Sequence, residues 1–453
     1  MKKRVIQPAP GLGKLAGSDL QSISDLVDAL MGEFGKLTGI VQQANDKYLY
    51  WDKFKYLVPA GVSPEQAWLM LKLSRSSQRT ILPLKDVEGR SFSFWLPDSA
   101  QKYLHNIDRQ APKVIGSELD IINESSKKQY LISSLMEEAI ASSQMEGAST
   151  TRKVAKELLR TGRKPVTKAE KMIVNNYRTI QKIVELKKEK LSLDMLLELQ
   201  ASMTGGTLDS SEVGHLRTSD DISVVDSASY EILHEPPKAH ELPDRIELLC
   251  EFANSQKHDP GFIHPVVKGI LLHFWLAYVH PFADGNGRTA RALFYWYMLA
   301  NDYWLFEYLP ISYHLKKSRA QYERAFLHAE QDDNDATYFI IYHLRAIERA
   351  LQSLQDYLAK KQREYAETTR LLLKGNLGLN YRQQALIKHA LKRPGFIYTV
   401  ESHRNSHGVT PQTARSDLLS LVEQDLLILS QKGKKHYFIA PEDLVERVSR
   451  RGA

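Results

Sequence analysis

Apolar residues recur three and four positions apart along most of the chain, which is the spacing of one face of a helix. The longest apolar run, Gly269–Val279, leads through a polar loop into a second helical pattern, Ala290–Leu299. Other long helical patterns begin near Gln129, cover about Lys168–Lys190, and extend from Asp335 to about Leu373. The pattern predicts a mainly α-helical protein.

Segments with strand character are short. Ser91–Leu96 alternates apolar with other residues, and two β-prone runs, Ile222–Val225 and Tyr230–Leu233, flank a polar turn. The two runs predict a β-hairpin, which ends at Pro236 and Pro237 because proline cannot continue a strand ladder.

Residues 380–453 have a pattern of their own and predict a separate domain. Helices are expected over Arg382–Leu391 and Thr399–Ser406, and a third begins after Thr410-Pro411, a cap followed by a first-turn proline. Two apolar runs then flank a basic turn, Lys432-Gly433-Lys434-Lys435. This order resembles a winged helix-turn-helix.

The third of these helices would be the recognition helix of such a domain. Gln412, Arg415 and Ser416 are expected to lie exposed on it. Winged helices bind DNA or dock proteins, and the sequence leaves both partners open.

Composition narrows the class of protein. The length of 453 residues favours two to four domains, and 43% hydrophobic with 25% charged residues is typical of soluble globular proteins. The net charge of +7, from 61 basic and 54 acidic residues, favours acidic partners only weakly. The single cysteine, Cys250, excludes an internal disulfide framework and a cysteine-based zinc site.

Neither a signal peptide nor a membrane span is expected. The basic start Met1–Arg4 is not followed by an apolar stretch, and Gly269–Val279 is too short to cross a bilayer. We therefore expect a cytoplasmic protein with no membrane partner.

The polar loop between the two apolar helices carries the candidate chemistry. Gly285, Asn286 and Gly287 allow backbone conformations that direct successive amides at one anion, at the start of a helix whose dipole favours negative charge. Arg288 and Arg291 are three apart, so both can reach that anion. The chain has no Gly-x-x-x-x-Gly-Lys motif, so a P-loop does not explain these residues.

Two further residues complete the loop. Asp284 offers a hard oxygen ligand suited to Mg²⁺, and His280 lies at the loop mouth, where a base could take a hydroxyl proton. The loop therefore has the parts of a nucleotidyl-transfer site. His215 and His234 are expected to be structural or surface residues.

The segment 280–291, His-Pro-Phe-x-Asp-Gly-Asn-Gly-Arg-x-x-Arg, resembles the core motif of the Fic family at every defining position. Most Fic proteins transfer AMP from ATP to protein hydroxyls. The resemblance covers roughly residues 126–345, and the predicted hairpin matches the family's flap, which holds a target segment by strand addition.

The resemblance implies ATP and Mg²⁺ as cofactors and a Ser, Thr or Tyr hydroxyl of a target protein as acceptor. It implies that His280 is the general base and that Asp284 holds Mg²⁺. The residues implied for ATP binding are Glu146, Gly285, Asn286, Gly287, Arg288, Arg291 and Ser318. Where family members often have Asn-Arg followed by Tyr-Tyr, this chain has Ser318-Arg319 and Tyr322-Glu323.

A second motif lies upstream. Ser142, Glu146 and Gly147 fit the pattern Ser-x-x-x-Glu-Gly, which resembles the inhibitory helix of Fic proteins. In the family this glutamate pairs with the second arginine of the core motif, here Arg291. The alternative is a purely structural role, in which Glu146 is a glutamate on a helix surface next to the glycine that ends the helix.

We therefore expect four parts: an N-terminal module (1–125), a Fic catalytic domain with its inhibitory helix (126–345), a linker helix (346–379) and a winged helix domain (380–453). The expected activity is protein adenylylation, restrained by Glu146. Two alternatives stay open: removal of AMP from a target, and a DNA-binding regulator whose Fic core senses nucleotide or modifies itself. The sequence leaves the target and the choice between monomer and homodimer open.

Overall fold

The computed structural model describes residues 7–10, 37–113, 124–225, 230–254, 261–374, 378–432 and 435–450. These residues are mainly helical, as the periodicity predicts, with three small antiparallel sheets. The chain divides into two compact units, Met1–Leu354 and Gln355–Ala453, each described here by itself. The four-part division expected from the sequence stays a prediction.

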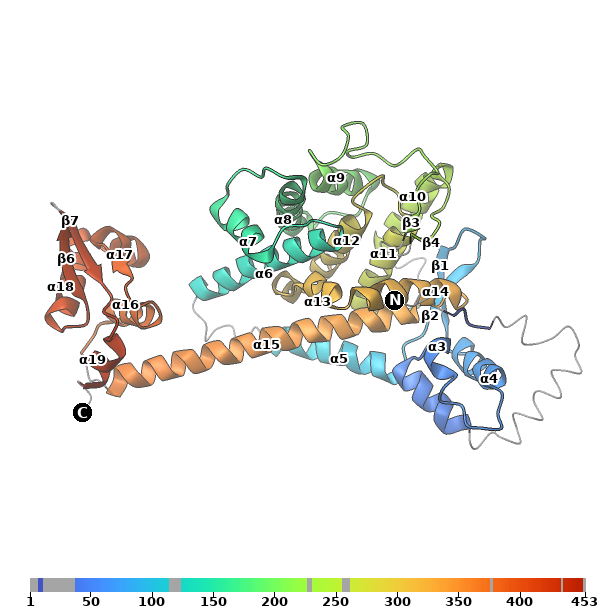
Figure 1. Cartoon of the computed structure of the whole chain (residues 1–453), viewed down its shortest axis with the longest axis horizontal. Coiled ribbons are helices and arrows are strands. Elements are labelled where there is room, and N and C mark those ends of the chain that lie inside the picture. The colour runs from blue at the N-terminus through green and yellow to red at the C-terminus, as the bar shows by residue number, and fades with distance from the viewer. Residues whose placement is uncertain are drawn as a thin grey trace, which may run out of the picture. The chain divides into compact units, whose positions relative to one another are not determined.

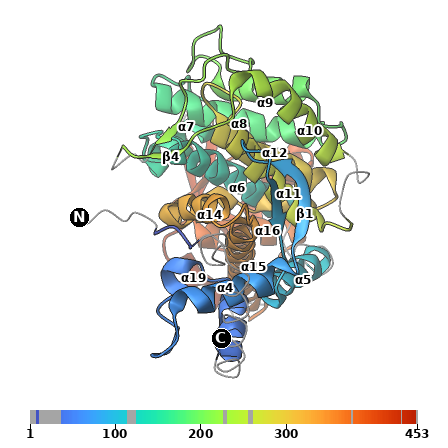
Figure 2. The same cartoon turned by 90° about the vertical axis from the view of Figure 1, so that its right-hand side faces the viewer.

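Two antiparallel helices, α11 and α12, form the centre of the first unit (Figures 1 and 2). Nearly every side chain of both helices is buried, which explains why α11 reads as a continuous apolar run. The bounds of the central and surrounding helices are α6 (Glu124–Met145), α7 (Arg152–Thr161), α8 (Lys168–Leu186), α9 (Leu193–Thr204), α10 (Leu242–Asn254), α11 (Pro265–Val279) and α12 (Asn286–Ala300).

Local sequence signals set several of these helix ends. The hydroxyls of Thr151, Thr167 and Ser192 each accept a backbone hydrogen bond from the third residue of the helix that follows. Helix α11 begins with Pro265, where the missing N–H would have no partner in any case. The hydroxyl caps satisfy backbone amides in the first turns of α7, α8 and α9, which would otherwise lack a partner.

The N-terminal part of the unit holds α3 (Trp51–Phe54), α4 (Pro64–Ser76), β1 (Thr80–Lys85), β2 (Ser91–Phe94) and α5 (Asp98–Lys113). The strand predicted near residue 91 is present, and its antiparallel partner β1 was not anticipated. Pro83 lies inside β1, a position tolerated because the sheet has only two strands and both are edges.

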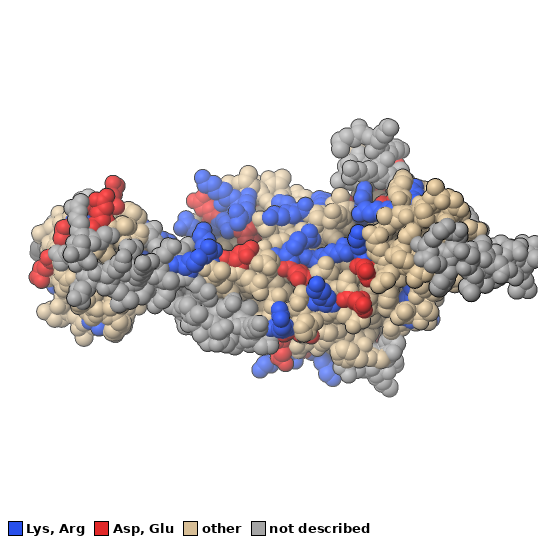
Figure 3. Space-filling view, turned by 90° about the horizontal axis from the view of Figure 1, so that it is seen from below, with Lys and Arg blue, Asp and Glu red and all other residues tan. Residues whose placement is uncertain are grey.

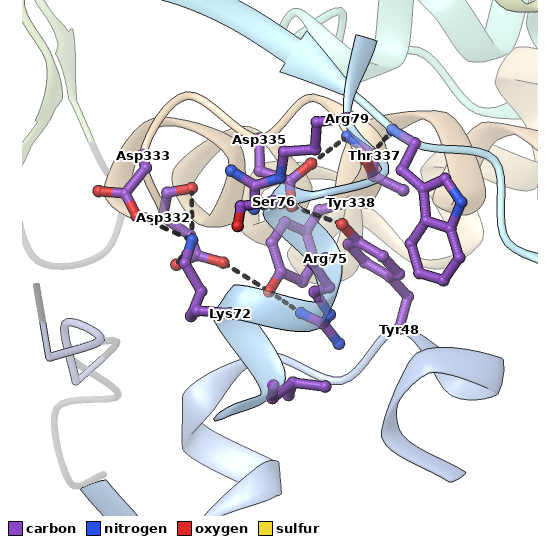
Figure 4. A network of polar contacts seen from close by, with 12 residues as sticks. Tyr48, Lys72, Arg75, Ser76, Arg79, Asp332, Asp333, Asp335, Thr337 and Tyr338 are labelled. Carbon is purple, nitrogen blue, oxygen red and sulfur yellow. Dashed lines mark hydrogen bonds and ion pairs between the residues drawn. The ribbon is translucent and has the colours of Figure 1, made fainter. Parts of the chain in front are cut away.

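A buried polar network fixes this N-terminal part to the turn between α14 (Arg319–Gln331) and α15 (Thr337–Lys374). Lys72 pairs with Asp332 at 2.7 Å, and Arg79 pairs with Asp335 at 2.6 Å (Figure 4). The hydroxyl of Tyr48 also donates to Asp335 at 2.5 Å. Removing one partner would leave an uncompensated buried charge, so the network favours one arrangement of these elements.

The remaining elements of the first unit are a hairpin, two 3-10 helices and one short α-helix. A two-stranded hairpin, β3 (Val224–Val225) with β4 (Ile232–His234), confirms the predicted hairpin, although residues 226–229 at its tip lie outside the described part. Two 3-10 helices, Ala239–Glu241 and Trp304–Tyr308, and α13 (Ile311–Lys317) complete the unit.

The second unit carries α16 (Tyr381–Lys392), β5 (Ile397–Tyr398), α17 (Val400–His407), α18 (Pro411–Glu423), β6 (Ile428–Lys432), β7 (Lys435–Ile439) and α19 (Leu444–Arg450). Its antiparallel sheet has the order β5-β7-β6, with Ile428 opposite Ile439. Figure 1 shows β6 and β7 beside the helices of this unit. A core of its own includes Ile387, Leu418 and Phe438. The three predicted helices are present; the identification as a winged helix stays a prediction, and Gly433 and Lys434 lie outside the described residues.

Surface charge gives no single basic face in the view of Figure 3. Lysine and arginine side chains are interspersed there with aspartate and glutamate. Among the described residues, no helix is long and apolar enough to cross a membrane.

Candidate active site

The loop between α11 and α12 is held in one conformation by its own backbone and by Asn286. His280 follows α11 in the left-handed region (φ 49°), and Gly285 precedes α12 with φ 90°, which glycine adopts at little cost. The side-chain oxygen of Asn286 accepts from the amide of Phe282 (2.9 Å), and its NH₂ donates to the carbonyl of Phe282 (2.7 Å). Asn286 therefore braces the loop through its side chain.

Two residues that the sequence reasoning did not single out also fix the loop. Arg217 donates from its backbone amide to Pro281 (2.9 Å) and from Nε to the carbonyl of His280 (2.9 Å). Gln200 of α9 donates to the carbonyl of Asp284 at 3.1 Å. Arg217 and Gln200 thus hold the first and second halves of the loop.

The electrostatics of His280 favour a neutral imidazole. Burial, and secondarily the positive charge of His234, lower the pKa of His280 to about 4. Nδ1 lies 3.4 Å from the carbonyl of Ala277, an acceptor, which assigns the proton to Nδ1 and leaves the Nε2 lone pair free. A neutral imidazole with a free lone pair is the form that a general base requires.

The low pKa of His280 predicts a specific pH dependence. The Cε1–H signal of His280 in NMR, identified by its loss in His280→Ala, should stay constant from pH 8 to 5 and move only near pH 4, because the imidazole is neutral above its pKa. A midpoint near the ordinary value of about 6.5 would contradict the assigned environment.

Asp284 lies beside the start of α12 and is half exposed. Its Oδ1 accepts from the amide of Gly285 (2.6 Å) and from the buried guanidinium of Arg288 (3.1 Å). Among the described residues no hydrogen bond reaches Oδ2. Mg²⁺ in nucleotide sites is usually held by one or two carboxylates together with phosphate oxygens, so a single half-exposed carboxylate fits that ion.

Arg288 itself faces inward. Its side chain is 0% exposed and also donates to the carbonyl of Met203 at 3.0 Å. It therefore orients Asp284 and α9, whereas Arg291 is the arginine that approaches the upstream motif.

Arg291 is held by the end of α6. Its Nε donates to the hydroxyl of Ser142 (2.8 Å), and one NH₂ group donates to the carbonyl of Ser142 (3.0 Å) and to Oε1 of Glu146 (2.9 Å). Glu146 lies just past the last residue of α6, and Gly147, with φ 90°, turns the chain away. The structure thus brings Ser142, Glu146 and Arg291 together.

The carboxylate of Glu146 also rests on the first turn of α12. A Cβ atom built on Gly287 would lie 2.2 Å from Glu146 Oε1 and 3.1 Å from an NH group of Arg291. The amino end of a helix attracts anions through its free amides and its dipole. Glu146 therefore occupies the place where an anionic group would bind.

An open pocket of about 180 Å³ adjoins these residues. Its lining includes Glu146, His280, Gly287, His234 of the hairpin, and α14 residues from Arg319 to Glu330. Ser318 is not among the lining residues: its hydroxyl lies 2.8 Å from that of Tyr342. The pocket therefore joins the loop, the upstream glutamate, the hairpin and α14, but not Ser318.

Comparisons with known proteins find similarity to one family. Residues 190–298 match the sequence profile of the Fic/DOC family. A protein adenylyltransferase Fic of Nematostella vectensis is 33% identical over 107 residues, 24% of this chain and 22% of that protein. Protein adenylyltransferase fic-1 of Caenorhabditis elegans is 29% identical over 105 residues, 23% of this chain and 18% of that protein.

Over residues 190–298 this chain is similar to the Fic/DOC family. It spans about a fifth of the length of these curated relatives, so the relation to the adenylyltransferases is distant. A Fic family protein from Desulfovibrio desulfuricans has a similar fold, with a TM-score of 0.50 at 19% identity over 75% of this chain and 96% of that one. A structure of C. elegans Fic-1 gives 0.50 at 15% identity over 76% and 95%.

The hairpin is held beside the loop by His234. Its Nδ1 faces Oε2 of Glu330 at 2.8 Å, and its Nε2 faces the carbonyl of Tyr278 at 2.7 Å. Both partners are acceptors, so both ring nitrogens donate and the imidazole is charged. Burial lowers the pKa of His234, but the hydrogen bond and charge of Glu330 outweigh it and raise that pKa above its ordinary value.

The charged His234 predicts that the hairpin loosens in alkali. Because its folded-state pKa is raised, its stabilisation is complete below about pH 6.5 and is lost as the pH rises through the folded-state pKa. Amide-exchange protection factors for β3 and β4 should fall over that window. Glu330→Gln should remove the step, whereas Glu323→Gln, on the same helix and also lining the pocket, should retain it. Identical profiles in the two variants would contradict the assignment.

Proposed function

We propose that this protein is an ATP-dependent protein adenylyltransferase whose resting state is closed by Glu146. The observation that carries the proposal is the loop itself, a free Nε2 on His280 beside a helix N-terminus whose anion position holds a carboxylate. A site built only to terminate helices would need neither the base nor the buried guanidinium of Arg291.

In the proposed reaction a Ser, Thr or Tyr hydroxyl of a target protein attacks the α-phosphorus of ATP. The new O–P bond forms as the bond from the α-phosphorus to the oxygen of the β-phosphate breaks, and pyrophosphate leaves with that electron pair. The hydroxyl proton passes to Nε2 of His280. The amides of Asn286 and Gly287, in the first turn of α12, stabilise the charge that develops on the phosphate oxygens, while the amide of Gly285 stays bonded to Asp284.

Arg288 and Arg291 have different roles in this proposal. Arg291, released from Glu146, binds an outer phosphate, and Arg288 acts from within by holding Asp284. Asp284 would hold Mg²⁺, and the ion would supply countercharge for the phosphates. Ser318 keeps its predicted ATP contact only if the segment between α13 and α14 rearranges, because its hydroxyl now faces Tyr342.

Autoinhibition follows from competition for one place. A γ-phosphate and the carboxylate of Glu146 would both bind Arg291 and the first turn of α12. Arg291 is 3% exposed and Glu146 32%, so their charge-assisted hydrogen bond is partly desolvated and competes with a phosphate oxygen. Displacing Glu146 is therefore the activating step.

The proposal assigns the hairpin to target binding. Val225 and Ile232 are 45% and 58% exposed at its edges, and an extended target segment added to an edge strand would lie next to His280. The reverse reaction, hydrolysis of an AMP-modified target with Glu146 positioning water, uses the same residues and remains the alternative within this proposal.

Purified protein incubated with ATP and Mg²⁺ tests the proposal. Peptide mass spectrometry should detect AMP on a hydroxyl of the protein itself or of a lysate protein. Incubation with a target already carrying AMP, which should stay modified under the main proposal, separates transfer from the reverse reaction. Loss of AMP without any gain in the first experiment would favour hydrolysis.

A second proposed function concerns the C-terminal unit, which we propose is a winged helix that binds DNA. Three observations support it: the helices α16, α17 and α18, the sheet order β5-β7-β6, and the exposure of Gln412, Arg415 and Ser416 on α18 opposite buried Ala414 and Leu418. Recognition helices present such a polar face to the major groove.

DNA binding by this unit should depend steeply on salt, since phosphate contacts release counterions. Arg415→Ala should cost about 1–3 kcal/mol on a preferred sequence and relax the preference, while Lys435→Ala should weaken all sequences alike and lower the salt slope by about 1. Arg447→Ala, on α19, is the control. The affinity of the full chain for a random pool of DNA duplexes should be measured at several salt concentrations. If no binding that depends on salt is found, the unit is more consistent with docking of a protein.

A further inference from the structure

A second pocket, of about 240 Å³, lies in the first unit away from His280. One wall is the segment from Lys47 to Lys53, and the other comes from α14 and α15. Helix α14 separates the two pockets: Arg319, Tyr322, Glu323 and Phe326 line the catalytic pocket, whereas Gln321, Arg324, Ala325 and His328 line the second.

Unpaired cations surround this second pocket. Lys47, Lys53, Arg324 and Arg345 line it, and Asp52 is the single carboxylate among the lining residues. None of the four cations forms an ion pair with a described residue; Arg345 only donates to the backbone carbonyl of Lys47, at 3.2 Å. In the catalytic pocket, by contrast, the lining arginine, Arg319, already pairs with Glu323.

The pocket has an aromatic wall with free polar atoms. Tyr50 stacks on His328 with ring centroids 4.0 Å apart and planes 10° from parallel. Nε2 of His328 and Oδ1 of Asp52 are buried and have no hydrogen-bond partner among the described residues. Burial, then the nearby charges of Arg324 and Lys53, lower the pKa of His328 to about 3, so the ring is neutral and both cations lie close to it.

These features match one class of ligand. Four unpaired cations attract a doubly charged group, and arginine and lysine together are the usual partners of phosphate. A buried carboxylate oxygen without a donor would repel a bare anion, but it is satisfied by a hydroxyl carried by the same molecule. We propose that the second pocket binds a small soluble phosphate ester, with its phosphate between Arg324 and Lys53 and a hydroxyl on Asp52.

Calorimetric titration of the full-length protein with glycerol 3-phosphate, without ATP, tests the site. Arg324→Ala and Lys53→Ala should each weaken binding about tenfold, the usual contribution of one charge-assisted hydrogen bond. Arg349→Ala, an exposed arginine one turn beyond Arg345 on α15 and not in the pocket, should change binding less than twofold. Equal binding by the wild type and the three variants would overturn the proposal. None of the variants alters the catalytic loop, so binding of the ligand there would be the same in all four proteins.

Asp52 provides the second arm of the experiment. Wild type should bind glycerol 3-phosphate more tightly than inorganic phosphate, and Asp52→Asn should tighten inorganic phosphate and erase the preference. If the wild type preferred inorganic phosphate, Asp52 would not bind a hydroxyl of the ligand, and the proposal would be overturned. If the protein bound vesicles that contain phosphatidic acid but did not bind glycerol 3-phosphate, the ligand would be a lipid headgroup and the proposal of a soluble ligand would be wrong.

Discussion

His280→Ala is expected to lower AMP transfer by roughly 10²–10⁴-fold, the usual contribution of a positioned general base. The imidazole is neutral at physiological pH and holds its proton on Nδ1, so the substitution removes the free lone pair at Nε2. The anion site of Gly287 and Arg291 is not touched by the change, and ATP binding should therefore remain within a few-fold of wild type. Initial rates of labelling and a separate ATP-binding titration measure the two effects.

The control for His280→Ala is His215→Ala. His215 is exposed and does not line the pocket, so its replacement should leave the rate unchanged. Labelling by His280→Ala at the wild-type rate would show that another group takes the proton.

Glu146→Gly should raise autolabelling on the order of 10²-fold, since displacement of reacting groups by about 1 Å costs that much and the carboxylate lies where we propose that a phosphate binds. The residue lies beyond the end of α6, so glycine there costs little helix stability. Combining Glu146→Gly with His280→Ala should abolish the gain. The measurement is the initial labelling rate at saturating ATP and Mg²⁺.

Glu137→Gly is a stringent control for this effect. Glu137 lies on α6 and pairs with Arg152 and Lys156, away from Arg291. Glycine inside the helix should lower stability without raising the labelling rate. If the Glu146→Gly protein labelled itself no faster than wild type, Glu146 would be a structural residue, which is the alternative interpretation of its motif.

The parts of the site that lie close together in sequence were predictable. The spacing of residues 280–291 anticipates a helix, a glycine-containing loop and a second helix, because each local conformation depends on residues within one or two turns. The contact between Glu146 and Arg291 spans 145 residues and was expected only through the family resemblance. Periodicity alone gives no signal for a contact of that kind.

Contacts between residues far apart in sequence, which hold the loop and the hairpin in place, were not predicted for the same physical reason. Arg217 reaches His280 across 63 residues, and His234 reaches Glu330 across 96. Each depends on how helices pack in three dimensions, and an isolated arginine or histidine in sequence is not distinguishable from a surface residue. The buried pairs of Lys72 and Arg79 with the turn before α15 were hidden likewise, because charged residues are normally expected outside.

The most direct test of the account is the fate of the α-phosphate. Glu146→Gly protein incubated with Mg²⁺ and ATP carrying ³²P at the α position should acquire stable label, whereas ATP labelled at the γ position should give none. Adding His280→Ala should eliminate the α label. Label from the γ position alone, or no label from either in the Glu146→Gly protein, would contradict AMP transfer by this site.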